Sequence, residues 1–124
     1  MTGDLYKIKF IFPNMGDAEG ELIRVKGPHL TEIFNRSLPV NSRGLKRGDL
    51  FVIPVSFYYA AEKPLKIGKK GDIVFDPLAK AVIILLAETR FDLKVAVIGS
   101  ITKNMKIIEK IERSSGVRIE SIED

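Results

Sequence analysis

The chain of 124 residues contains no cysteine, no glutamine and a single histidine, His29. Without cysteine it can form neither disulfide bonds nor thiolate metal sites. His29 follows Pro28, a residue favoured at the first position of a helix, so no Ser-His-Asp or Cys-His catalytic arrangement is credible around it. Because soft and imidazole ligands are scarce, we expect no metal site and no bound cofactor.

Long hydrophobic runs are absent as well. The longest apolar run, residues 81–87, is far shorter than the ~20 residues that a membrane-spanning helix needs. The first residues hold no basic segment followed by an apolar one, which predicts no signal peptide. Together with the missing cysteine, this favours a cytoplasmic protein. Abundant isoleucine, lysine and glutamate without glutamine is typical of heat-adapted proteins.

Short apolar segments recur along the whole chain. In residues 5–12 the alternating Tyr6, Ile8, Phe10 and Phe12 predict a half-buried strand. Further strands are predicted at residues 19–26, 40–47, 50–60, 73–75, 81–87, 91–101 and 117–122. Many short strands without alternating helices are typical of a barrel or sandwich, and the length indicates a single domain, residues 1–124.

Two helices interrupt the strands. Apolar residues at helical spacing predict one helix over residues 28–38 and another over 105–113, the second capped by Asn104. Pro54 cannot donate a ladder hydrogen bond, so it indicates a sheet edge or a bulge. Gly99 within a strand indicates a bulge or a close backbone approach.

Four stretches carry a resemblance to a known family. The segment 91–112, with Phe91-Asp92, Val97-Ile98-Gly99 and Ile107-Ile108-Glu109, is similar to the closing strand and helix of cyclophilins. The other three resemble small prokaryotic cyclophilin-like proteins of unassigned function, and they are Asn41-Ser42-Arg43-Gly44, Gly48-Asp49-Leu50-Phe51-Val52-Ile53-Pro54-Val55 and Gly71-Asp72-Ile73-Val74-Phe75-Asp76-Pro77. The order of these stretches matches as well.

The resemblance implies a mainly β fold, a closed eight-stranded cyclophilin-like β-barrel whose ends are capped by two α-helices. It also implies an outer groove that binds an extended peptide. Because the polar groups of cyclophilin chemistry are hard to find here, we expect this groove to bind an extended peptide or small ligand without chemistry. We expect Arg43 to donate hydrogen bonds there and Asp76 to anchor polar groups. The expected apolar walls are Phe51, Phe75, Ile84 and Phe91.

Two other functions stay open. A weak peptidyl-prolyl isomerase would use Arg43 as its catalytic donor, but the Phe-His-Arg and Phe-Met-x-Gln stretches of cyclophilins have no match here. Single-stranded nucleic acid could bind a basic rim, although the net charge of +4 falls short of a dense basic stripe. The rim would combine Arg43, Lys46, Arg47, Lys63, Lys66, Lys69 and Lys70.

Three further points concern partners and geometry. Pro54 and the polar strand 40–47 could mark an edge through which a second copy pairs to give a homodimer.

Asp72 and Asp76 would face one way on a strand, but we expect solvated carboxylates there and no metal. The sequence leaves open whether Arg43 or Arg47 faces the groove.

Overall fold

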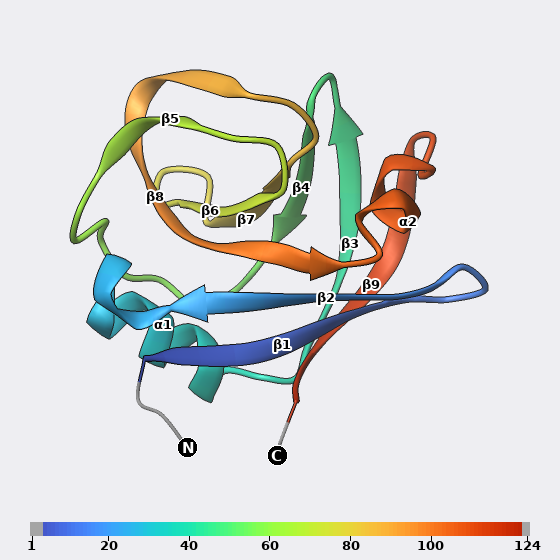
Figure 1. Ribbon diagram of the computed structural model, residues 1–124, viewed down its shortest axis with the longest axis horizontal. Coiled ribbons are helices and arrows are strands. Elements are labelled where there is room, and N and C mark those ends of the chain that lie inside the picture. Colours follow the sequence, from blue (N-terminus) through green and yellow to red (C-terminus); the bar gives the residue numbers. More distant parts are fainter. Residues whose placement is uncertain (1–3, 123–124) are drawn as a thin grey trace.

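The computed structural model describes residues 4–122, which fold into a closed antiparallel β-barrel with two α-helices (Figure 1). The barrel wall consists of β1 (Leu5–Phe12), β2 (Gly16–Ile23), β3 (Val40–Arg47), β4 (Leu50–Pro54), β6 (Asp72–Asp76), β7 (Ala81–Leu85), β8 (Thr89–Lys103) and β9 (Ser114–Ser121). Their order is β2-β1-β9-β3-β4-β7-β6-β8, and β8 pairs back with β2. The predicted closed barrel of eight strands is confirmed.

The barrel closes at the seam between β2 and β8. There Leu22 lies opposite Gly99, and the two backbones approach closely. A Cβ on Gly99 would lie 2.0 Å from the carbonyl oxygen of Glu21, and a Cβ on Gly20 would lie 2.9 Å from that of Ser100. Because only glycine has no Cβ, it alone permits this approach, as the sequence predicted for Gly99.

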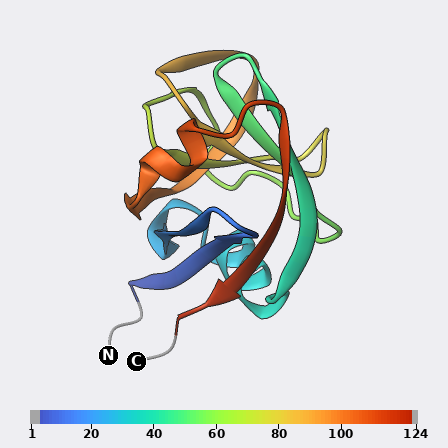
Figure 2. The same ribbon diagram turned by 90° about the vertical axis from the view of Figure 1, so that its right-hand side faces the viewer.

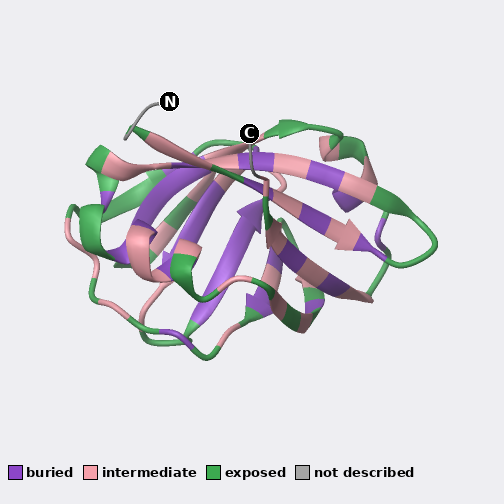
Figure 3. Cartoon of the chain, turned by 90° about the horizontal axis from the view of Figure 1, so that it is seen from below, coloured by how far each residue is buried: buried purple, intermediate pink, exposed green. Residues whose placement is uncertain are grey.

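Side chains that alternate along the strands fill the barrel. Ile8, Phe10 and Phe12 of β1 and Val117 and Ile119 of β9 are buried, while their neighbours are partly exposed (Figure 3). β3 runs beside β9 along the wall in Figure 2, as their antiparallel register requires. The pattern that predicted half-buried strands is therefore the pattern of the wall.

The helices lie near opposite ends of the β1–β2 hairpin (Figure 1). Leu30 and Phe34 of α1 (Pro28–Arg36) and Ile108 of α2 (Met105–Glu109) belong to the same buried cluster as the inward strand side chains. Both helices begin at the predicted residue and end earlier than predicted. Within residues 4–122, neither helix has the length and apolarity to cross a membrane.

The start of α2 differs from the prediction. Asn104 has a left-handed backbone with φ of 64° and makes no capping bond; its Nδ2 instead donates to the carbonyl oxygen of Asp17 at 3.0 Å. The helix is held at its other end, where Lys46 Nζ donates to the Glu109 carbonyl at 3.2 Å and Lys70 Nζ lies 2.7 Å from Glu109 Oε2. Lysines at a helix C-terminus satisfy its orphan carbonyls.

A second apolar cluster lies on the outside of the wall. It consists of Val74, Ile83, Leu85, Val95 and Val97, with Phe91 packed against it. A ninth strand, β5 (Leu65–Gly68), pairs only with β8 (Figure 1). A Cβ on Gly68 would lie 2.5 Å from Leu85 Cδ1, so β5 crosses the wall at close range. The strands predicted from the sequence include none between residues 60 and 73, so β5 was missed.

The strand predicted over residues 50–60 ends at Pro54, and the following loop buries Phe57 against Phe34 with ring centroids 4.9 Å apart. The ladder between β3 and β4 ends at Val52, while β4 pairs with β7 through Pro54. Pro54 therefore lies where the ladder between β3 and β4 has already ended. In the described part of the chain, residues 40–44 of β3 pair with β9 and not with β4, so pairing of this strand with a second copy stays a prediction.

The seam predicts unequal effects of two glycine substitutions. We expect Gly99→Ala to lower the free energy of unfolding by about 2 kcal/mol or more, because its Cβ would meet a backbone carbonyl that cannot move aside. Gly116→Ala is the control: its Cβ would lie 3.8 Å from Pro13, an ordinary contact, and should change stability by less than about 0.5 kcal/mol. Urea unfolding measures both, and equal effects would contradict this account of the seam.

Candidate functional site

The expected apolar walls do not form one groove. Phe51, Phe75 and Ile84 are 0% exposed inside the barrel, where no ligand reaches them while the wall is closed. Phe91 packs in the outer cluster, on the opposite side of the wall. Phe75 and Ile84 lie on strands whose central residues are buried on both faces, so the sequence pattern does not say which of them face inward. Phe51 lies on β4, where buried and less buried residues alternate.

The two expected polar residues are also apart. Arg43 is exposed, and its Nη2 donates to Ser114 Oγ at 3.0 Å. Asp76 accepts hydrogen bonds from the Leu78 and Ala79 amides, at 3.0 and 3.4 Å, and so closes its own turn. β4 and β7 separate their strands, which places the backbones of Arg43 and Asp76 ~14 Å apart at an inter-strand spacing of about 4.8 Å.

Arg43 and Arg47 occupy the same face of β3. A Cβ on Gly44 would lie 2.2 Å from Phe51 Cζ, so position 44 faces the interior. By strand alternation both arginines face outward.

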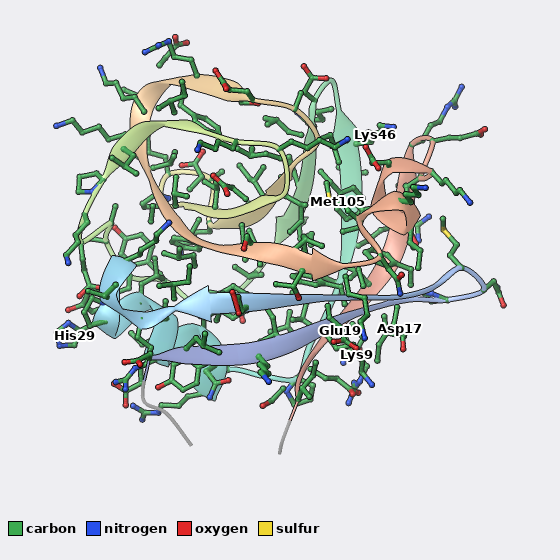
Figure 4. All side chains as sticks on the ribbon, viewed as in Figure 1. Lys9, Asp17, Glu19, His29, Lys46 and Met105 are labelled. Carbon is green, nitrogen blue, oxygen red and sulfur yellow. The ribbon has the colours of Figure 1, made fainter. Side chains whose placement is uncertain are left out.

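The cationic side chains expected to form one rim are dispersed. Lys46 and Lys70 contact Glu109 of α2, whereas Lys63 follows a glutamate that binds His29 of α1. Figure 4 shows Lys46 and His29 on opposite sides of the molecule. Lys63 therefore lies apart from Lys46 and Lys70, so the seven cationic side chains do not all share one surface.

A different site lies between β5 and the outer wall, and we call it the β5 pocket. It has a volume of about 390 Å³. Its lining residues are Lys26, Leu65, Ile67, Gly68, Lys69, Asp72, Glu88 and Val97. Sequence reasoning missed this site because β5 was not predicted. The signal was present in the alternation of Leu65 and Ile67 with lysines.

The charged groups of the β5 pocket are Lys26, Lys69, Asp72 and Glu88, two of each sign. Asp72 Oδ2 accepts a hydrogen bond from the Lys69 amide at 2.8 Å, which fixes the carboxylate at the β5–β6 turn. Among the ion pairs of residues 4–122, none involves these four side chains. The pocket therefore joins apolar walls to charges that no protein group neutralises.

Two shallower hollows flank Pro39, which follows Leu38 through a cis peptide bond, and we call them the Pro39 groove. Their volumes are about 400 and 310 Å³. Arg118 lies at this groove, where its Nε donates to Glu120 and its Nη1 donates to Asn41 Oδ1. The hydrogen bond from Arg118 lowers the pKa of Glu120. The arginine here is already neutralised by a protein carboxylate.

The N-terminus of α1 is capped by a residue far along the chain. Glu62 accepts hydrogen bonds from the Leu30 amide at 2.9 Å and the His29 amide at 3.0 Å, and it lies 2.7 Å from His29 Nδ1. Partial burial on its own raises the pKa of Glu62, but these hydrogen bonds together lower it below its usual range. The His29 ring also stacks on Tyr59 with centroids 5.5 Å apart.

Within residues 4–122, no three histidine, aspartate or glutamate side chains gather as metal ligands. Asp72 and Asp76 each bond to backbone amides of their own turn instead.

No protein-family model matches this sequence, and no curated protein matches it. Among solved structures, the hypothetical protein AF2241 from Archaeoglobus fulgidus is similar over 98% of both chains, with a TM-score of 0.80 and 19% identity. McbB, solved in complex with tryptophan, is similar over 94% of this chain and 46% of its own, with a TM-score of 0.77 and 15% identity. These similarities establish the barrel fold alone. Neither protein is described as a cyclophilin, so that resemblance stays a prediction.

The cap of α1 predicts a pH-dependent loss of stability. At neutral pH, Glu62→Gln should lower the free energy of unfolding by about 1 kcal/mol, because an amide cannot accept all of these hydrogen bonds. The pKa of Glu62 is lower in the folded protein than in the unfolded chain. The carboxylate therefore stabilises the fold at pH values above the unfolded pKa, and this stabilisation is lost as pH falls through the folded pKa. The difference between the variant and wild type should therefore shrink from about pH 5 to about pH 2.

Thermal unfolding across this pH range measures the effect. Glu112→Gln, at an exposed position, is the control and should be neutral throughout. A difference for Glu62→Gln that stays constant down to the lowest pH would show that the ionised carboxylate is not what caps α1.

Proposed function

We propose that the protein binds a small amphipathic molecule in the β5 pocket without chemical conversion. The observation that carries this proposal is the combination, in one pocket, of exposed apolar side chains and unpaired charges. Leu65 and Ile67 are 48% and 40% exposed, although both lie on a strand next to a buried apolar cluster. Covering them would remove apolar area from water at roughly 25 cal/mol per Å².

The size and chemistry of the pocket agree with binding. A volume of about 390 Å³ falls within the range of small-molecule sites, which are mostly apolar with a few polar groups that orient the ligand. Its lining includes no hydroxyl, thiol or imidazole group, and its two lysines and two carboxylates are suited to orienting a charged ligand. Binding alone is the simplest function for such a lining.

The similarity to McbB supports the proposal. McbB was solved in complex with tryptophan, and its similar region covers 94% of the present chain with a TM-score of 0.77. A chain that contains this barrel therefore binds a small molecule with an apolar ring and charged groups. The β5 pocket suits a ligand of that general kind.

Prolyl isomerisation, which the resemblance to cyclophilins implies, has less support. It requires an arginine within hydrogen-bond reach of an apolar pocket. No arginine lines the β5 pocket, and Arg43 donates to Ser114 on a different strand pair. The arginine at the Pro39 groove, Arg118, is bonded to Glu120 and Asn41.

Titration with phenethyl alcohol, a neutral amphipathic probe, tests the location of the site. We expect the backbone-amide NMR signals of Ile67, Gly68, Lys69 and Val97 to shift at millimolar concentration, because the aromatic ring covers the apolar lining. Asn41 and Arg118 of the Pro39 groove serve as internal controls and should not shift. Shifts confined to the Pro39 groove would overturn the assignment.

A second experiment tests the isomerase alternative. NMR exchange spectroscopy of an X-Pro peptide should show no faster cis–trans exchange when the protein is added, because no arginine lines the β5 pocket and Arg43 donates to Ser114. Arg43→Ala is the matched variant. Acceleration by wild type that disappears in Arg43→Ala would replace the binding function with catalysis at Arg43.

A further inference from the structure

We propose that the ligand of the β5 pocket is a zwitterion, a small molecule that joins an ammonium group and a carboxylate to an apolar side chain, as a free α-amino acid does. This inference rests on the proposed function, and it adds the chemical class of the ligand. It is carried by the number, sign and placement of the charged side chains around the pocket.

The charges converge from separate elements. β5 pairs with the start of β8 so that Gly68 lies opposite Thr89, which brings Lys69 and Glu88 to the same end of the pocket. Asp72 joins them from β6, held by the Lys69 amide. Lys26 comes from the short 3-10 helix η1 (Arg24–Lys26) that follows β2. Three charged groups thus gather at the β5–β6 turn, and the fourth comes from a different part of the fold.

None of the four charged side chains forms an ion pair in the described part of the chain. This holds even for Lys69 and Glu88, which adjoin the paired residues Gly68 and Thr89. A ligand that carried only a negative charge would be repelled by Asp72 and Glu88. A ligand that carried only a positive charge would be repelled by Lys26 and Lys69. A zwitterion can place each group near its opposite, so like-charge repulsion does not offset the attraction.

The apolar part of the ligand has its own surface. Leu65 and Ile67 come from β5 and Val97 from the barrel wall, so they flank the pocket from two elements. Gly68 also lines the pocket, and having no side chain lets β5 lie close to Leu85 of the wall. A side chain of the size of leucine or phenylalanine would contact all three apolar groups while the charged end reaches the rim.

Four compounds that share one apolar group separate the contributions of the charges. They are L-phenylalanine, phenethylamine, hydrocinnamate and phenethyl alcohol, which are zwitterionic, cationic, anionic and neutral. We expect L-phenylalanine to bind the β5 pocket most tightly and each compound with a single charge to bind about tenfold more weakly, because one charge-assisted contact is lost. NMR titration of the pocket amides gives the dissociation constants and the location together.

Charge-removing variants assign the roles. Glu88→Gln should weaken the binding of L-phenylalanine and phenethylamine several-fold. The binding of hydrocinnamate should stay unchanged or become tighter. The double variant Lys26→Met, Lys69→Met should weaken the binding of L-phenylalanine and hydrocinnamate and leave that of phenethylamine unchanged or tighter. Lys66→Met on β5 and Glu112→Gln near α2 are matched controls at exposed positions outside the pocket lining, and they should change no dissociation constant.

The outcomes separate this inference from the proposed function. If all four compounds shift the pocket amides with equal affinity, the zwitterion assignment is wrong while the pocket remains a ligand site. If one singly charged compound binds tighter than L-phenylalanine, the ligand carries that charge alone and the inference is overturned. If none of the four shifts the pocket amides, the proposed function itself fails.

Discussion

Hydrogen bonds between β2 and β8 turn an eight-stranded sheet into a barrel, and the rest of the structure depends on that closure. Once the wall is closed, its interior must be filled by side chains, and Phe10, Phe51 and Phe75 are 0% exposed there. The recesses described above lie on the outer surface, where loops and the additional strand shape them.

The outer face of β6, β7 and β8 is the part of the wall that differs most from a simple barrel. It carries a second apolar cluster, and β5 crosses over it with Gly68 in close contact with Leu85. The strand covers part of this apolar surface and leaves Leu65 and Ile67 exposed beside it. The same arrangement that buries the outer cluster thus creates a recess with apolar walls at its margin.

Local patterns predicted most of the wall and little of the site. β1 and β9 were predictable because each has one buried and one partly exposed face, which leaves a period of two in the sequence. β7 was predictable as a strand, but all five of its residues are buried, so its inward face could not be read. Phe75 and Ile84 were placed in a groove for this reason, whereas the alternating burial of β4 puts Phe51 on an inward face.

The remaining errors arose from long-range contacts. β5 has four residues and is a strand because it pairs with the distant β8. The alternation of Leu65 and Ile67 with lysine is too short to predict a strand by itself. Asn104 looked like a helix cap but bonds to Asp17, and the true cap of α1 is Glu62, more than 30 residues away. The β5 pocket assembles residues from η1 to β8, and no local motif contains them.

The pairing of the first strand with the last has a consequence for protein engineering. Ile8 lies opposite Ser121, and the Ile122 amide donates to the Lys7 carbonyl, so β1 and β9 are neighbours along the wall. A short polar linker could therefore join the two ends of the chain, and new termini could be opened at the Gly48 turn between β3 and β4. Such a circular permutant would keep every wall contact while changing the order in which the strands are synthesised.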